Sequence, residues 1–186
     1  MTVDAGIQDA GTFGKLDILV NNAGVRDEGL RPVDKVTDSE IDRVCRHKYQ
    51  RRYVLYTTQY IKDMLKIKRV LLLTWQAAPA ERRRRGSLRG IKGSIFWESR
   101  KHTAIRCAKS GVRCNALCPS MIKTPMADTT GEIMDSDMME SVMAHSDLTL
   151  PDAVHKMLPT AFLFFASDEA APITGQCVAL DYGSNL

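Results

Sequence analysis

Short apolar runs recur along the chain, and polar stretches with helical spacing separate them. Four short segments are rich in aliphatic residues, at residues 17–21, 70–74, 112–117 and 176–181. Runs of this kind, bounded by Gly, Pro, Asn or Asp, are typical of strands that are buried on both faces. Because the runs alternate with helical patterns, the sequence predicts an α/β fold with a mostly parallel sheet and right-handed crossovers.

A long helix is predicted after the first run. Thr37 and Glu40 are spaced as a capping box, in which each side chain satisfies an otherwise unpaired helix amide. Apolar residues then follow at spacings of three and four, at Ile41, Cys45, Tyr49, Tyr53, Tyr56, Tyr60 and Met64. This spacing predicts a continuous face that packs on the sheet or on a partner helix. Base stacking by the tyrosines is the alternative.

Three further helices are expected after the second run. A short helix is predicted from Glu98 to Ser110, and an amphipathic helix is predicted over residues 131–145. The strongly apolar segment from Pro159 to Ala166 predicts the third. Its proline suits the first turn, where a missing N–H leaves no hydrogen bond unmade.

The first run ends in the sequence Asn21-Asn22-Ala23-Gly24. Small residues at the end of a strand allow a flat ligand to approach the backbone closely. In open α/β sheets, ligands bind beyond the carboxyl ends of the strands. The motif therefore marks a candidate binding site, and an ordinary strand-ending turn is the alternative.

The net charge of +4 hides an uneven distribution. Residues 43–113 carry 20 basic and 3 acidic groups, whereas residues 1–42 and 114–186 are acidic. The basic stretch at residues 76–96 lacks a clear apolar period, so we expect an irregular, solvated insert within one domain of residues 1–186. Binding of a nucleic acid or another anionic surface through Arg82 to Arg85 is one interpretation. A solvated charge run is the usual case.

The five cysteines are odd in number and lack the spacing of metal ligands, so we expect no metal site. Cys114 and Cys118 fall in a predicted strand, where buried reduced thiols are the expected state. The chain also has no apolar run of membrane-spanning length and no signal-peptide pattern at its start. Together these features predict a cytoplasmic protein.

Three blocks of sequence follow one another in a distinctive order. They are Asp17–Gly24, Gly111–Met126 and Phe164–Gly183, the last of which contains Ile173-Thr-Gly-Gln176. Taken together, they resemble the short-chain dehydrogenase/reductase family. Its members are Rossmann-type oxidoreductases that transfer hydride between NAD or NADP and an alcohol or carbonyl. The resemblance implies a doubly wound parallel sheet, which we expect to be incomplete because nothing before Leu16 matches the family's first strands and Gly-rich turn.

The resemblance also assigns residues to the binding of NAD or NADP. Those on the adenosine side would be Asn22, Ala23 and Gly24, those near the nicotinamide and its phosphates would be Pro119, Ile122 and Thr124, and Lys101 would hold the ribose. Asn115 and Asp181 would have structural roles.

The same alignment indicates that most catalytic groups are replaced. The family uses a Tyr as acid/base, a Lys four residues later, a Ser and an Asn. Here these positions hold Trp97, Lys101, Trp75 and Lys48, so Lys101 alone is retained. An indole cannot exchange a proton near neutral pH. By resemblance, the chain is therefore an NAD(P)-dependent short-chain oxidoreductase whose substrate would be an alcohol or carbonyl. We expect it to be inactive with the residues that it carries at these positions.

A non-catalytic interaction role is the alternative. Members of the family often associate through the helix that is predicted here at residues 38–66, so the resemblance implies a homo- or hetero-oligomer through that helix. Without a further neighbour, the strand at residues 17–21 would also be an apolar sheet edge, and such edges favour association.

Overall fold

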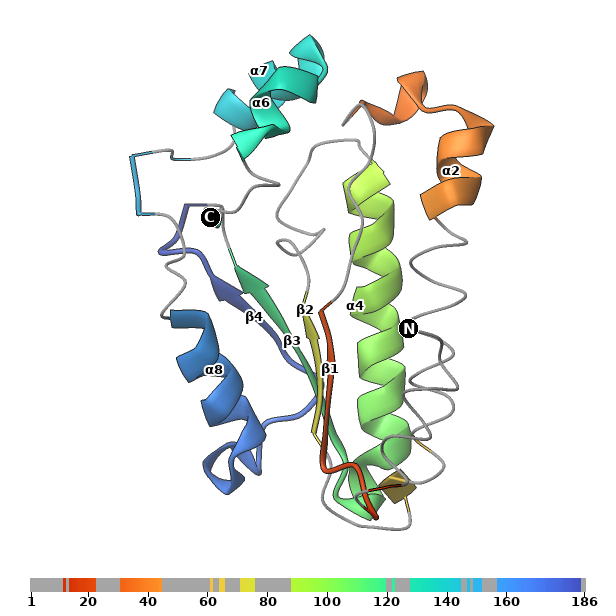
Figure 1. The fold of residues 1–186 in the computed structure, drawn as a ribbon, viewed down its shortest axis with the longest axis vertical. Coiled ribbons are helices and arrows are strands. Elements are labelled where there is room, and N and C mark those ends of the chain that lie inside the picture. Colours follow the sequence, from red (N-terminus) through yellow and green to blue (C-terminus); the bar gives the residue numbers. More distant parts are fainter. Residues whose placement is uncertain are drawn as a thin grey trace.

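Four parallel strands form one sheet in the structure, which is a computed structural model (Figure 1). Their bounds are Ile18–Asn21 for β1, Leu71–Trp75 for β2, Arg113–Pro119 for β3 and Cys177–Leu180 for β4, and they lie in the order β1-β2-β3-β4. The structure describes residues 12, 14–22, 31–44, 61, 64–65, 71–75, 88–119, 122, 128–144, 147, 149–151 and 157–184. All four predicted strands are confirmed, as is the parallel α/β sheet.

Helices cover both faces of the sheet. Helix α4, Leu88–Cys107, lies along one face, and helix α8, Met157–Ala166, lies on the other (Figure 1). On the α4 face, Ala104 packs with Cys114 and Leu19. On the α8 face, Leu117 packs with Phe165. Strands of a parallel sheet need apolar cover on both faces, and these two clusters supply it for β3.

The start of α4 corrects the sequence prediction. We expected a loop through residue 96 and a short helix from Glu98, but the helix begins at Leu88 and ends at Cys107, and a 3-10 turn follows at Ala108–Ser110. Apolar residues at Leu88, Ile91 and Ile95 continue the helical spacing, and this outweighs the low helix propensity of the intervening glycines. The remainder of the expected insert, residues 76–87, lies outside the described residues.

The predicted capping box is present at the start of helix α2, Asp38–Val44, which follows the 3-10 turn η1, Val33–Lys35. The backbone N–H of Thr37 donates to Glu40 Oε2 at 2.9 Å, and the N–H of Glu40 donates to Thr37 Oγ1 at 3.4 Å. The tyrosines of the predicted stripe lie outside the described residues. Its last member, Met64, is 1% exposed and packs against the sheet-side cluster of Cys107 and Val112.

Two helices replace the single helix predicted over residues 131–145. They are α6, Thr130–Ile133, and α7, Ser136–Ala144. The chain is extended at Met134, and Asp135 Oδ1 then accepts a hydrogen bond of 3.0 Å from the N–H of Asp137. An Asp that bonds to the backbone in this way competes with a continuous helix and starts a new one.

The outer strand β1 is half-covered. Leu19 faces α4, but Ile18 and Val20 are 43% and 44% exposed. The sequence predicted burial on both faces, and this is wrong for one face because α8 packs mainly against β2 and β3. Among the described strands, β1 is an edge with apolar side chains, as the resemblance implied.

Asn115 joins β3 to the segment that leads into β4. It is fully buried; its Nδ2 donates to the carbonyl of Ile173 at 2.8 Å, and its Oδ1 accepts from the N–H of Gln176 at 3.0 Å. Beside it, Gly175 has a φ of +72°, and a Cβ there would lie 3.4 Å from the Cβ of Ala104. The structural role implied for Asn115 therefore has a direct physical basis.

Four described cysteines are free, namely Cys107, Cys114, Cys118 and Cys177, while Cys45 lies outside the described residues. Cys118 Sγ lies 3.0 Å from Cys177 Sγ on the neighbouring strand. Burial raises the pKa of Cys114 to about 12, and the charge of Arg100 opposes this in part. The buried, reduced thiols expected at Cys114 and Cys118 are thus confirmed.

We expect Asn115→Ala to lower the free energy of unfolding by about 2 kcal/mol, because it leaves two backbone groups without their buried partner. Urea denaturation followed by circular dichroism measures the change. Gln176→Ala is the matched control, since the exposed side chain is removed while the N–H that bonds to Asn115 remains. Equal losses for the two variants would contradict the role assigned to Asn115.

We also expect Cys114 to resist alkylation in the native protein. With a pKa of about 12, only about one thiol in ten thousand is ionised at pH 8, and the thiolate is the reactive form. Because the folded pKa lies above the ordinary thiol value of 9.0, this group favours the native state below pH 9 and loses that effect as the pH rises toward 12. Iodoacetamide labelling with mass spectrometry should modify the partly exposed Cys177 first, and Cys114 only in urea. Equal native labelling would refute the prediction.

Candidate functional site at the carboxyl edge of the sheet

The strand pairing shows that β1 ends at the level where β4 begins, three residues before the ends of β3 and β4. Asn21 pairs with Thr74, Thr74 with Ala116, and Ala116 with Cys177. The strands are parallel, so all four carboxyl ends lie on one edge, at the end of the molecule where α2, α6 and α7 are seen in Figure 1. We call this the carboxyl edge.

The structure places several of the predicted binding residues at the carboxyl edge. Asn22 is exposed and directly follows β1, Pro119 is buried at the end of β3, and Ile122 is partly buried just beyond it. β2 separates β1 from β3, so these two strands lie roughly 10 Å apart. Of the other predicted binding residues, Ala23, Gly24 and Thr124 lie outside the described residues.

Two of the positions aligned with catalytic groups lie on α4. Trp97 and Lys101 are four residues apart and share one side of the helix by its period. Lys101 is about half-exposed, and its Nζ lies 3.8 Å from Glu98 Oε1. Trp75 ends β2, between the strands that carry Asn22 and Pro119. Lys48 lies outside the described residues.

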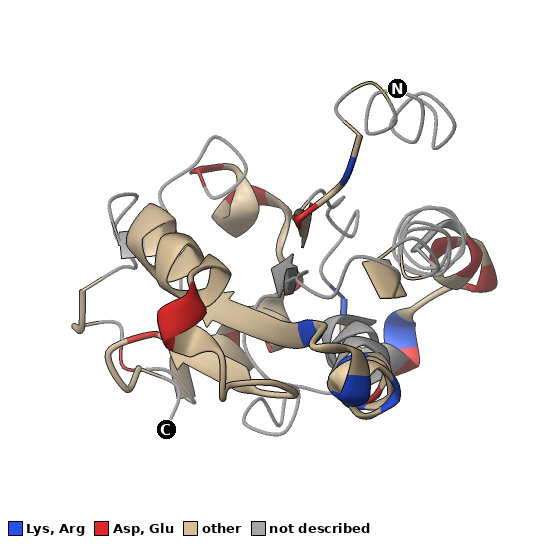
Figure 2. Cartoon of the chain, turned by 90° about the horizontal axis from the view of Figure 1, so that it is seen from below, with Lys and Arg blue, Asp and Glu red and all other residues tan. Residues whose placement is uncertain are grey.

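Arg100 is a residue whose position the sequence reasoning missed. The solvated stretch was expected at residues 76–96, and Arg100 lies beyond it on α4, where Figure 2 marks several Lys and Arg positions in blue. Arg100 is nevertheless 1% exposed and acts on the pKa of Cys114. Ala104 and Cys107, four and seven positions later, are also buried. This helical spacing is the signal that could have identified the buried side of α4.

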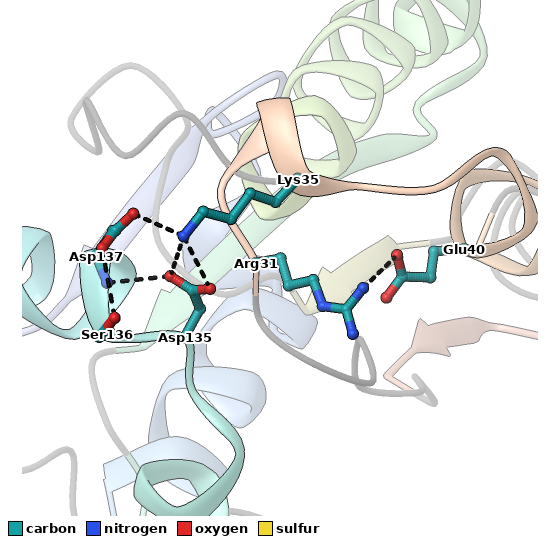
Figure 3. A network of polar contacts seen from close by, with 6 residues as sticks. All are labelled: Arg31, Lys35, Glu40, Asp135, Ser136 and Asp137. Carbon is teal, nitrogen blue, oxygen red and sulfur yellow. Dashed lines mark hydrogen bonds and ion pairs between the residues drawn. The ribbon is translucent and has the colours of Figure 1, made fainter.

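A second missed feature is an ion cluster between distant parts of the chain (Figure 3). Lys35 Nζ lies 2.7 Å from Asp137 Oδ2 and 3.3 Å from Asp135 Oδ2. The hydrogen bonds to the two aspartates raise the pKa of Lys35, and the hydrogen bond and charge of Lys35 lower the pKa of Asp137. Nothing in the sequence pattern connects residues that are about a hundred positions apart.

The described residues contain no group of three or more His, Cys, Asp or Glu side chains that could hold a metal ion. Within the same part of the chain, no helix combines the length and the apolar character that a membrane span requires.

Comparison with known proteins gives the chain its family. Residues 2–185 match the family described as enoyl-(acyl carrier protein) reductase. Oxidoreductase UcpA of Salmonella typhimurium is 32% identical over 188 residues, which cover 94% of this chain and 67% of that protein. The 3β-hydroxysteroid dehydrogenase 2 of Eggerthella lenta is 27% identical, over 97% of this chain and 68% of its own length. The chain thus spans about two thirds of the length of these relatives.

Solved structures show the same fold. The 3-ketoacyl-(acyl-carrier-protein) reductase of Brucella melitensis, solved in complex with NADH, is 25% identical with a TM-score of 0.82, and the match covers 99% of this chain and 74% of that one. Levodione reductase has a TM-score of 0.80 at 20% identity, covering 98% of this chain and 72% of its own. The incomplete Rossmann-type sheet implied by the sequence is thereby confirmed. The family match and the relatives together establish that this chain belongs to the short-chain dehydrogenase/reductase family.

Proposed function

We propose that the chain binds a nicotinamide nucleotide, NAD or NADP, across the carboxyl edge. The observation that carries this proposal is the register, which brings Asn22 and Pro119 to the same edge with one strand between them. Ligands of open α/β sheets bind beyond the carboxyl ends of the strands. The complex of NADH with the 25%-identical reductase of Brucella melitensis supports the nucleotide as the ligand.

The described residues at this edge fit such a ligand. The exposed amide of Asn22 can donate and accept hydrogen bonds, which suits the adenosine side. Pro119 and Ile122 offer apolar surface to a nicotinamide ring. Half-exposed Lys101 lies on α4 one turn before Ala104, which packs against Cys114 near the start of β3, so its proposed contact with a ribose or phosphate rests on the family resemblance. Ala23, Gly24 and Thr124 complete the proposed set.

We infer that this chain holds the nucleotide without efficient turnover. A bound nicotinamide nucleotide supplies or accepts a hydride in this family's reactions with alcohols and carbonyls. The protein must move the accompanying proton, and Trp97 stands where that group is required. An indole N–H does not exchange its proton in the neutral range. Trp75 and Lys48 leave the serine and asparagine positions without their usual groups.

Association is a second part of the proposal. Ile41 is 40% exposed at the start of the helix predicted over residues 38–66, and it supports a homo- or hetero-oligomer through that helix. The exposed β1 side chains Ile18 and Val20 offer a further apolar surface. A reducing compartment such as the cytoplasm would keep the described thiols free, and it is the location that we propose.

Binding is tested by energy transfer from tryptophan to NADH or NADPH. Both tryptophans of the chain, Trp75 and Trp97, belong to the proposed site, so bound nucleotide should quench their emission and fluoresce itself. The melting temperature should rise in parallel, with about 2.7 kcal/mol of stabilisation at a hundredfold excess over Kd. Asn22→Ala should weaken the binding, whereas the exposed Glu132→Ala on α6 should not. Absence of both signals at millimolar nucleotide would refute the proposal.

Turnover is tested by restoring the acid/base. We expect Trp97→Tyr to oxidise small secondary alcohols with NAD or NADP at least about a hundredfold faster than the unchanged chain, since general acid–base catalysis contributes about 10²–10⁴-fold. Absorbance of the reduced nucleotide measures the rate. Trp97→Phe is the control, because it changes the size of the side chain without adding a hydroxyl. Equal rates for the unchanged chain and Trp97→Tyr would show that Trp97 does not limit the reaction.

A further inference from the structure

Lys35 connects two segments that lie at the carboxyl edge. It belongs to η1, which follows β1, and its two partners stand at the start of α7, which follows β3 (Figure 3). The Nζ lies 2.7 Å from Asp137 Oδ2, and 3.4 Å and 3.3 Å from the two carboxylate oxygens of Asp135. One ammonium thus lies between two carboxylates from a segment about a hundred residues away.

On the η1 side, the charged group stands on ordered backbone. The N–H of Lys35 donates to the carbonyl of Pro32 at 3.0 Å, which closes the turn. The capping box of Thr37 and Glu40 follows directly, and Arg31 lies 3.7 Å from Glu40 across the same turn. The backbone that carries Lys35 is therefore held by hydrogen bonds at η1 and at the start of α2.

On the α7 side, hydrogen bonds to the backbone of α7 hold Asp135. Asp135 Oδ1 accepts from the N–H of Asp137, and the carbonyl of Asp135 accepts from the N–H of Met139 at 2.9 Å. Asp135 is the less exposed partner, with a side chain 18% exposed. Negative charge at a helix start is favoured by the helix dipole. The ion cluster therefore links the starts of two structural elements rather than two freely moving side chains.

The linked segments stand on either side of the proposed nucleotide site. β1 leads through Asn22 toward η1, and β3 leads through Pro119 and Ile122 toward α6 and α7. Figure 1 shows α2, α6 and α7 at the same end of the molecule, beyond the carboxyl edge. A contact between these segments consequently spans the edge where a nucleotide would enter.

We propose that Lys35, Asp135 and Asp137 form an electrostatic clasp that holds the α6–α7 segment against η1 and slows entry and exit at the carboxyl edge. The part that concerns entry rests on the proposed nucleotide site, whereas the clasp itself does not. The side chains of Lys35 and Asp137 are 44% and 64% exposed, so dissolved salt screens the attraction. The clasp is therefore closed at low ionic strength and loosens at high ionic strength.

Hydrogen exchange of the full chain tests the clasp. Lys35→Glu places three carboxylates together, and we expect amide exchange in residues 136–144 to become about two- to fivefold faster, the range of an exposed ion pair. Lys35→Glu combined with Asp137→Lys restores opposite charges and should return the exchange toward the original rate. Lys15→Glu is the matched control: it makes the same charge change at another exposed pair, Lys15–Asp17, far along the chain from α7.

The amides of β3, residues 113–119, serve as the internal reference. Faster amide exchange in α7 of Lys35→Glu, with unchanged exchange in β3, supports the clasp. Loss of this difference between Lys35→Glu and the unchanged chain in molar salt also supports it. Equal acceleration of α7 and β3, or equal effects of Lys35→Glu and Lys15→Glu, would overturn it, since either would reflect general destabilisation.

The release rate of NADH, followed by tryptophan energy transfer, separates the two proposals. Faster release from Lys35→Glu, with recovery in the charge-reversed double variant, supports control of entry by the clasp. If Lys35→Glu accelerates amide exchange in α7 but the chain binds no NADH, the clasp is supported and the nucleotide site is refuted. Altered exchange with bound nucleotide and an unchanged release rate would overturn the role in entry.

Discussion

The rest of the sheet depends on the buried junction between β3 and the chain that enters β4. Asn115 bonds to Ile173 and Gln176, the N–H of Gly175 donates to the carbonyl of Cys114, and the N–H of Ala116 donates to the carbonyl of Gln176. A slip of one residue would turn every side chain of β3 to the opposite face. By fixing this register, the junction directs Cys114 toward α4 and Leu117 toward α8, and it sets where β3 ends at Pro119.

The elements that could be predicted from sequence are those whose signals are local. Strands appear as short apolar runs, and the capping box of Thr37 and Glu40, which spans four residues, predicts the start of α2. The start of α4 was missed because its glycines and positive charges suggest a loop, although Leu88, Ile91 and Ile95 keep the helical period. At the candidate site, Asn22 and Pro119 were proposed from the family blocks. Arg100 and Lys35 were not, because burial and long-range charge pairing depend on tertiary contacts.

Family membership and catalytic competence rest on different residues in this chain. The fold requires buried positions such as Asn115, Leu117 and Phe165, and all of them are occupied by residues that satisfy their surroundings. The positions that we aligned with catalytic groups on β2 and α4, Trp75 and Trp97, take no part in the hydrogen bonds of Asn115 that join β3 to the chain entering β4. The register of a sheet therefore does not establish its chemistry, because a fold alone does not establish an activity.

The carboxyl edge combines two kinds of constraint with different consequences. The strand ends at this edge are fixed by main-chain hydrogen bonds. Such bonds are insensitive to salt because the bonded groups are neutral and buried. The segments beyond the strand ends are joined by Lys35 and the carboxylates of Asp135 and Asp137. Salt screens the attraction between these groups over about 10 Å at 0.1 M. Ionic strength should thus alter the rates of ligand entry and release more than the position of the bound ligand at the strand ends. If salt changes only the rates of ligand binding and release, the charged residues control entry to the site. If salt also changes the position of the bound ligand, they belong to the site itself.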